Sequence, residues 1–166
     1  MPPPIPPRYR DIRPLLAADE VNFGVGGLLL FKLDEIENGQ IGYSVARDGS
    51  ALSSARNGVW NPNWIAIGHD TACGDPLILD TSDPALPILH DFNGQGRWNP
   101  RRVSLSIESF VASLNEFARL ATGRSTPVEQ EANPVTEAER EKFLARISEL
   151  NGGHVDLDFW GALLEC

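Results

Sequence analysis

Histidine and aspartate side chains recur at the ends of the apolar segments in the middle of the chain, and these residue types are suited to chemistry. His69 and Asp70 end one segment, Asp75 precedes the next, and Asp91 ends a third. If the segments are antiparallel strands, the four side chains could converge at one end of a sheet. They could then bind a divalent cation or pair a histidine base with a carboxylate, as in a metal-dependent hydrolase. Turn aspartates and strand-end histidines also commonly bind backbone amides, so both interpretations stay open.

The motifs that specify common enzymes and metal centres are absent. None of the three histidines, His69, His90 and His154, forms an i, i+4 pair with another ligand, and the sequence has no H-E-x-x-H, C-x-x-C or G-x-S-x-G. The glycine cluster at 24–27 fails the dinucleotide fingerprint because position 29 is leucine. We therefore predict a chain that is not an enzyme, with no catalytic residues, no metal ligands and no cofactor.

The chain is acidic, and its charge is unevenly distributed. The net charge is −9, and no Lys or Arg occurs between Arg56 and Arg97. That gap holds five aspartates, namely Asp70, Asp75, Asp80, Asp83 and Asp91. Such a surface repels phosphate backbones, which argues against direct nucleic-acid binding. It would suit a basic protein partner, although the same acids could simply keep the protein in solution.

Two of the four tryptophans lie in polar loops. Trp60 and Trp98 are each followed by Asn-Pro, whereas Trp64 and Trp160 lie in apolar segments and are predicted to be core residues. Loop tryptophans either serve as exposed anchors for a partner or fold back over a sheet, and both alternatives stay open. Trp60, Trp98 and the five aspartates together are the predicted partner-binding residues.

Period-two and period-3.6 patterns predict an α+β fold. Strands are expected at 27–33, 41–45, 64–68, 76–80, 87–91 and 103–105, with the central ones forming an antiparallel meander. Ser106 is a candidate N-cap for an amphipathic helix that Gly123 ends, and Thr136 with Glu139 forms a capping box for another. Residues 156–164 are expected to form a short closing helix. The result is a central, mainly antiparallel β-sheet packed by amphipathic helices.

The 166 residues suggest one domain in three parts. Residues 1–20 are a proline-rich segment, of which 1–14 are expected to form an extended tail. Residues 21–123 are the α+β core, and 124–166 are a linker at 124–135 with C-terminal helices packing on the core. No apolar run approaches the roughly 20 residues of a membrane span, and the N-terminus lacks signal-peptide features, so we expect a cytoplasmic protein with no membrane contact. The two cysteines, Cys73 and Cys166, are interpreted as a buried thiol and a frayed terminal one, not as a disulfide framework.

The order of the central motifs resembles the SUKH superfamily of SMI1/KNR4-like domains. The matching pieces are Trp64-Ile65-Ala66-Ile67-Gly68, Gly74-Asp75, Leu77-Ile78-Leu79-Asp80, His90-Asp91 and Ser106-Ile107-Glu108-Ser109-Phe110. The resemblance spans roughly residues 24–120. It departs from the family at the start, where two helices around a Leu-Pro motif are usual and this chain offers only the prolines and a short candidate helix near 12–19.

The resemblance implies a non-catalytic protein-binding role. Bacterial members act largely as immunity proteins that neutralise a polymorphic toxin, often a nuclease, and fungal relatives act as regulatory scaffolds. We therefore expect an immunity protein that binds a basic, nuclease-type toxin domain through its acidic surface. A scaffold of the same fold and a metal-dependent hydrolase using His69, Asp70, Asp75 and Asp91 are the alternatives. The sequence does not specify the partner's identity or the oligomeric state.

Overall fold

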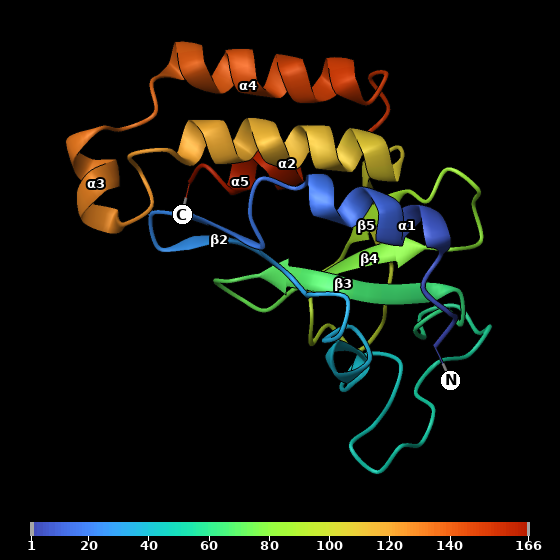
Figure 1. Ribbon diagram of the computed structural model, residues 1–166. Coiled ribbons are helices and arrows are strands. Elements are labelled where there is room, and N and C mark those ends of the chain that lie inside the picture. Colours follow the sequence, from blue (N-terminus) through green and yellow to red (C-terminus); the bar gives the residue numbers. More distant parts are fainter. Residues whose placement is uncertain (1, 166) are drawn as a thin grey trace.

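A computed structural model describes residues 2–165, and its centre is a six-stranded antiparallel sheet in the order β1-β2-β3-β4-β5-β6 (Figure 1). The strands are β1 Glu20–Phe23, β2 Gly26–Leu30, β3 Trp64–Asp70, β4 Pro76–Asp80, β5 Ile88–His90 and β6 Arg101–Ser104. The helices are α1 Pro7–Ile12, α2 Ile107–Ala121, α3 Pro127–Ala132, α4 Glu137–Leu150 and α5 Leu157–Ala162, with 3-10 turns η1 Arg13–Leu15 and η2 Asn38–Gln40. Because every strand pairs with its neighbours in the chain, the predicted meander and the α+β class are confirmed.

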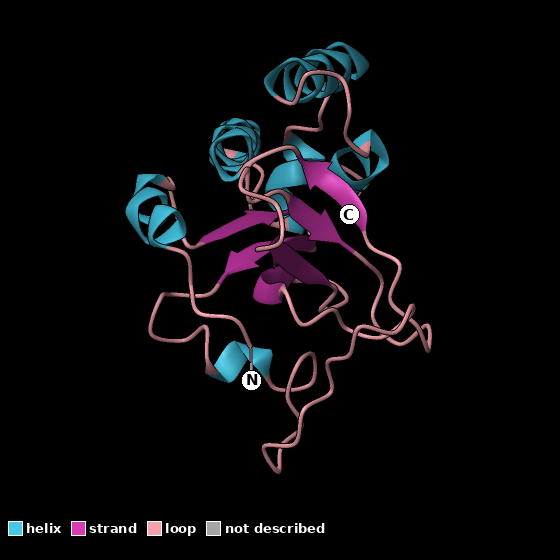
Figure 2. Cartoon of the chain, turned by 90° about the vertical axis from the view of Figure 1, so that its right-hand side faces the viewer, coloured by secondary structure: helices cyan, strands magenta, loops and turns pink. Residues whose placement is uncertain are grey.

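The main helices cover one face of the curled sheet, and α4 lies outside α2 (Figures 1 and 2). Both begin where the sequence predicts, because the hydroxyls of Ser106 and Thr136 accept hydrogen bonds from the amides three residues on. The apolar stripe of α2 is buried, and it packs with inward-facing strand residues in the larger of two apolar clusters. Trp160 on α5 is fully buried in this cluster, as predicted.

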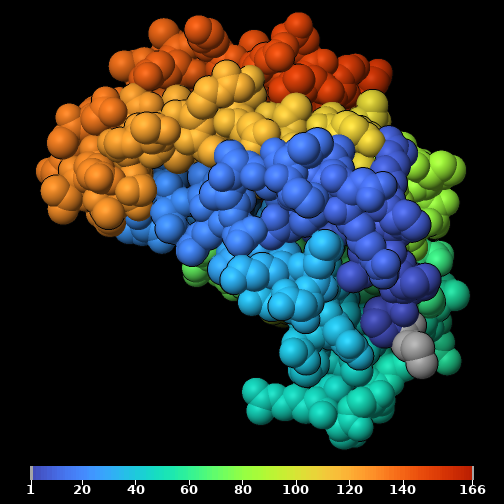
Figure 3. Space-filling view, in the orientation of Figure 1, coloured from blue at the N-terminus to red at the C-terminus, as the bar shows by residue number. Residues whose placement is uncertain are grey.

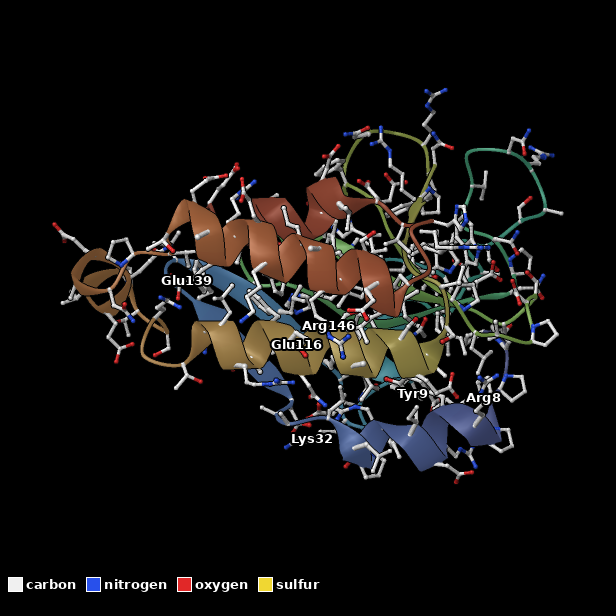
Figure 4. All side chains as sticks on the ribbon, turned by 90° about the horizontal axis from the view of Figure 1, so that it is seen from above. Arg8, Tyr9, Lys32, Glu116, Glu139 and Arg146 are labelled. Atoms are coloured by element: carbon white, nitrogen blue, oxygen red, sulfur yellow. The ribbon has the colours of Figure 1, made fainter. Side chains whose placement is uncertain are left out.

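The proline-rich start is not an extended tail, so this expectation is wrong. Pro7 lies in the first turn of α1, where its fixed φ favours the helix. Proline has no N–H, but N–H groups in the first turn have no acceptor within the helix, so no hydrogen bond is lost. Tyr9 on α1 is only 1% exposed and joins the main core. Arg8 reaches Glu108 on α2, with Nε 2.6 Å from Oε1 (Figure 4). Buried Arg13 donates to main-chain carbonyls at the end of β2, so the segment is anchored at several points.

The buried phenol of Tyr9 predicts a loss of stability at alkaline pH. Burial raises its pKa to about 12, against an opposing effect of nearby Arg13. The unfolded chain releases this proton near pH 10, so the contribution of Tyr9 is complete below pH 10 and is lost as the pH rises to 12. We expect urea unfolding to show a loss of roughly 2–3 kcal/mol over this range that a Tyr9→Phe variant lacks. If the wild type and Tyr9→Phe lose the same unfolding free energy over this pH range, the loss does not come from the phenol of Tyr9.

The other face of the sheet is covered by the long connection between β2 and β3. The expected strand at 41–45 is absent; this stretch forms only isolated bridges next to η2, and Ile41 is half exposed. The side chain of Gln40 makes strand-like hydrogen bonds instead, donating to the carbonyl of Ala66 and accepting from its amide. Part of this connection projects from the body of the molecule (Figure 3). The predicted linker at 124–135 also differs, because it contains α3.

The C-terminal segment is fixed against the edge strand β6. The indole N–H of Trp160 donates to the carbonyl of Val103, and the amide of Asp156 donates to the carbonyl of Arg102. These bonds set α5 beside the end of the sheet. No helix within residues 2–165 is long and apolar enough to cross a membrane. Cys73 is exposed, not buried as expected, and Cys166 lies outside the described residues.

Candidate acidic pocket

A β-bulge in β3 decides whether His69 or Asp70 faces the helices. The pairing with β4 shifts by one residue between Ala66 and Gly68. An inserted residue inverts the alternation beyond it, because side chains point to opposite faces with a period of two. Asp70 is therefore paired with buried Leu28 and lies on the helix side of the sheet.

The four residues predicted to converge do not form one group, because His69 lies on the other face. Its ring packs edge-on to Phe31, and its Nδ1 lies 2.7 Å from the carbonyl oxygen of Asp70. His90 takes its place: it pairs with buried Leu77 and so lies on the helix side. One ligand atom each from Asp70, Asp75 and His90 lie within 4.8 Å of one another.

These side chains line a pocket of about 570 Å³ between the end of the sheet and α5, which we call the acidic pocket. Its charged and aromatic lining consists of Asp70, Asp75, His90, Asp91, Phe92, Arg97, Arg101, Asp156, Asp158 and Phe159. Five aspartates thus face two arginines, and one arginine, Arg101, is already 3.6 Å from Asp156. Phe92 is 57% exposed at the pocket and supplies an apolar surface beside the acids. The pocket therefore combines an excess of negative charge with aromatic walls.

Three aspartates of the acidic pocket also organise its loops. Asp70 accepts from the amides of Cys73 and Asp75, at 2.6 and 2.7 Å. Asp75 accepts from the amide of Asn93, and Asp91 accepts from those of Phe92 and Asn99. The expectation that turn acids bind backbone amides is therefore confirmed. These bonds hold the carboxylates in place without neutralising their charge.

No Lys or Arg forms an ion pair with Asp70, Asp75 or Asp91 within residues 2–165. The ring of His90 is fixed instead by aromatic contacts, with centroids 4.7 Å from Phe159 and 5.5 Å from Phe92. Burial lowers the pKa of His90, while the surrounding carboxylates, first of all Asp75, act in the opposite direction. An approaching cation would therefore meet negative charge that no internal basic side chain has already paired.

The other predicted partner-binding residues lie away from this pocket. Asp80 ends β4 at the opposite end from Asp75, and Asp83 lies in the turn that follows, 3.8 Å from Arg102. Trp60 is 1% exposed, so of the two alternatives the one in which the ring folds back over the sheet is confirmed for it, and the exposed anchor is not. It folds back beneath the sheet, and half-buried Trp98 packs against it with centroids 5.1 Å apart.

A second hollow of about 750 Å³ lies between α2 and α4, and its charges are largely paired within it. Arg146 on α4 is 3.6 Å from Glu116 on α2 and 2.7 Å from Glu149 on its own helix (Figure 4). Arg119 and Arg124 also pair with glutamates. Because its charges are satisfied internally, this groove is the weaker candidate for a charged ligand.

Sequence reasoning missed His90 as the partner of the two aspartates and missed the contribution of the C-terminal segment. This segment supplies Asp156, Asp158 and Phe159, about 65 residues after His90 and Asp91. A local sequence pattern cannot indicate that residues so far apart in the chain lie close together. The alternation of β5 carried a usable signal, because His90 is two residues from the apolar Ile88 and so shares its face. Comparison with protein-family models, curated proteins and solved structures gives no match to this chain.

Proposed function

We propose that this chain is a protein-binding domain of the SMI1/KNR4-like kind, and that it acts as an immunity protein neutralising a basic, nuclease-type toxin. The observation that carries the proposal is the acidic pocket, in which Asp70, Asp75 and Asp91 have no basic ion-pair partner among the described residues. The motif order from Trp64 to Phe110 and the antiparallel sheet packed by helices support the proposal, because the resemblance implies an α+β fold of this kind.

The acidic pocket suits a lysine or arginine side chain from the partner. Its carboxylates can accept hydrogen bonds from an ammonium or guanidinium group, and charge-assisted bonds of this kind are stronger than neutral ones. Phe92 and Phe159 offer aromatic surface to the cation and to its aliphatic stem. A nuclease binds phosphates with basic residues, so a protein that occupies those residues competes with the nucleic acid.

Reversing one charge at the pocket should weaken this binding without disturbing the fold. Asp158 is exposed, lines the pocket, and its carboxylate makes no hydrogen bond or ion pair within the described part of the chain. We expect Asp158→Lys to raise the Kd for the cognate toxin domain about tenfold, or about 1.4 kcal/mol, because it adds repulsion at the rim. Calorimetric titration of the purified domains measures the change.

Glu131→Lys is the matched control, because it makes the same charge change on α3, outside the pocket. Equal weakening by both variants would mean that only net charge matters and would reject the pocket as the binding site. Failure of the unaltered chain to bind or neutralise that toxin would reject the immunity role. Binding of another basic protein at the same pocket would favour the regulatory scaffold.

A further inference from the structure

We propose that Asp70, Asp75 and His90 form a binding site for a divalent cation of the zinc type. The inference goes beyond the proposed function and does not depend on a partner, since it concerns the isolated chain. It rests on the juxtaposition of two carboxylates and an imidazole inside the acidic pocket. The notable feature is the mixed donor set, because carboxylates alone are common on protein surfaces.

The spacing of the three side chains is close to that of a metal site. Their ligand atoms lie within 4.8 Å of one another. Ligands bound to zinc at about 2.0–2.2 Å lie roughly 3.5 Å apart when tetrahedral, so the groups must approach by about 1 Å. A small shift of the β3–β4 turn, which carries Asp70 and Asp75 at its two ends, can supply this while the hydrogen bonds from amides to their carboxylates are kept. The pocket leaves space beside them for water to complete the coordination.

Asp75 carries a negative charge in the pocket that no basic side chain of the described chain offsets. The residue is only 7% exposed. Oδ1 accepts from the amide of Asn93 at 2.7 Å, but Oδ2 accepts no hydrogen bond from any described residue. No Lys or Arg of the described chain pairs with it, and Asp70 adds a second negative charge beside it. A buried carboxylate without a counter-charge is costly, and a bound cation would remove that cost.

His90 makes zinc a better fit than magnesium or calcium. Neither ring nitrogen of His90 has a hydrogen-bond partner within residues 2–165, whereas the ring is held between Phe92 and Phe159. A fixed imidazole with free nitrogens is a common ligand for zinc, while magnesium and calcium favour sites made only of oxygen atoms. Three protein ligands would leave at least one coordination position open towards the pocket.

Titration of the untagged full chain with ZnCl₂ in chelator-free buffer tests the proposal. We expect one zinc per chain in calorimetry, and at least a tenfold loss of affinity in His90→Gln. Asp75→Asn is the second variant: it keeps the oxygen that accepts from Asn93 and removes the charge, so it separates lost ligation from lost folding. Far-ultraviolet circular dichroism of each variant confirms that it is folded before titration.

His154→Gln is the control, because His154 is exposed and is not among the residues that line the pocket. Binding that survives in His154→Gln and in Cys73→Ser but falls in His90→Gln and Asp75→Asn supports the site. Absence of binding to the unaltered chain overturns the proposal. So does equal binding by all variants, or loss of binding in Cys73→Ser alone, which would move the site to the exposed thiol.

Discussion

Replacing Trp60 by alanine is expected to lower the free energy of unfolding by about 3–5 kcal/mol, the usual cost of truncating a fully buried aromatic side chain to alanine. Trp60 is 1% exposed and forms the smaller apolar cluster with Ala66, Ile78 and Leu89. Its ring lies 5.2 Å from that of Tyr43, centroid to centroid. Removing the indole opens a large cavity under the sheet. Urea denaturation followed by circular dichroism measures the change.

Trp98→Ala is the comparison for this prediction. Trp98 lies in the same kind of Asn-Pro loop and packs on the same cluster, but it is only half buried. Truncating Trp98 is expected to lower the free energy of unfolding by about 1–2 kcal/mol. Its indole buries less apolar surface on folding than that of Trp60 and contacts fewer aromatic rings. A Trp60→Ala protein as stable as the wild type, with weaker partner binding, would contradict the burial and restore the anchor interpretation.

The parts of the fold that the sequence predicts well are those with strong periodicity and local end signals. The strand at 76–80 is found at the predicted bounds, and the helices after Ser106 and Thr136 begin at the predicted caps. In each case the residues that fix the element lie within it or next to it. Hydrogen bonds within a turn and a stripe of apolar side chains are local properties, so one sequence suffices to identify them.

The elements that the sequence does not predict depend on tertiary contacts. α1 is six residues long, too short to be stable alone, and it is held by Tyr9 in the core and by Arg8 on Glu108. β1 is four residues of mixed polarity that exist as a strand because β2 lies beside them. The apparent strand at 41–45 is lost because the side chain of Gln40 takes the hydrogen-bonding position beside β3.

In the candidate site, too, some features follow from the local sequence and others depend on tertiary contacts. That the strand-end acids Asp70, Asp75 and Asp91 gather at one end of the sheet follows from the meander, and the structure brings them to one pocket. The exclusion of His69 does not follow from strand alternation alone, because it depends on a bulge next to Gly68, and a glycine inside a strand only suggests that a bulge is present. The place of Asp156 depends on how the C-terminal segment docks on β6, which is a long-range contact.

Gly68 lies at this bulge, where β3 passes close to the main chain of β2, and Gly68→Ala is expected to destabilise the protein by about 3 kcal/mol or more. A Cβ at this position would lie 2.1 Å from the carbonyl oxygen of Leu29 and 3.0 Å from the Cα of Leu30. Both are main-chain atoms of β2, so a methyl group can be accommodated only by moving β2 away from β3. Such overpacking typically costs 1–3 kcal/mol, and the loss of sheet hydrogen bonds adds to it.

Gly161→Ala provides the matched control, because a Cβ there would meet the movable guanidinium of Arg140 at 3.0 Å, within a helix where alanine is preferred to glycine. We expect its stability to lie within about 1 kcal/mol of the wild type. Thermal and urea unfolding of the two variants should therefore differ widely. If Gly68→Ala is as stable as Gly161→Ala, β2 does not lie as close to Gly68 as the structure shows. The pairing of Asp70 with Leu28, which fixes the face on which Asp70 lies, would then be in question as well.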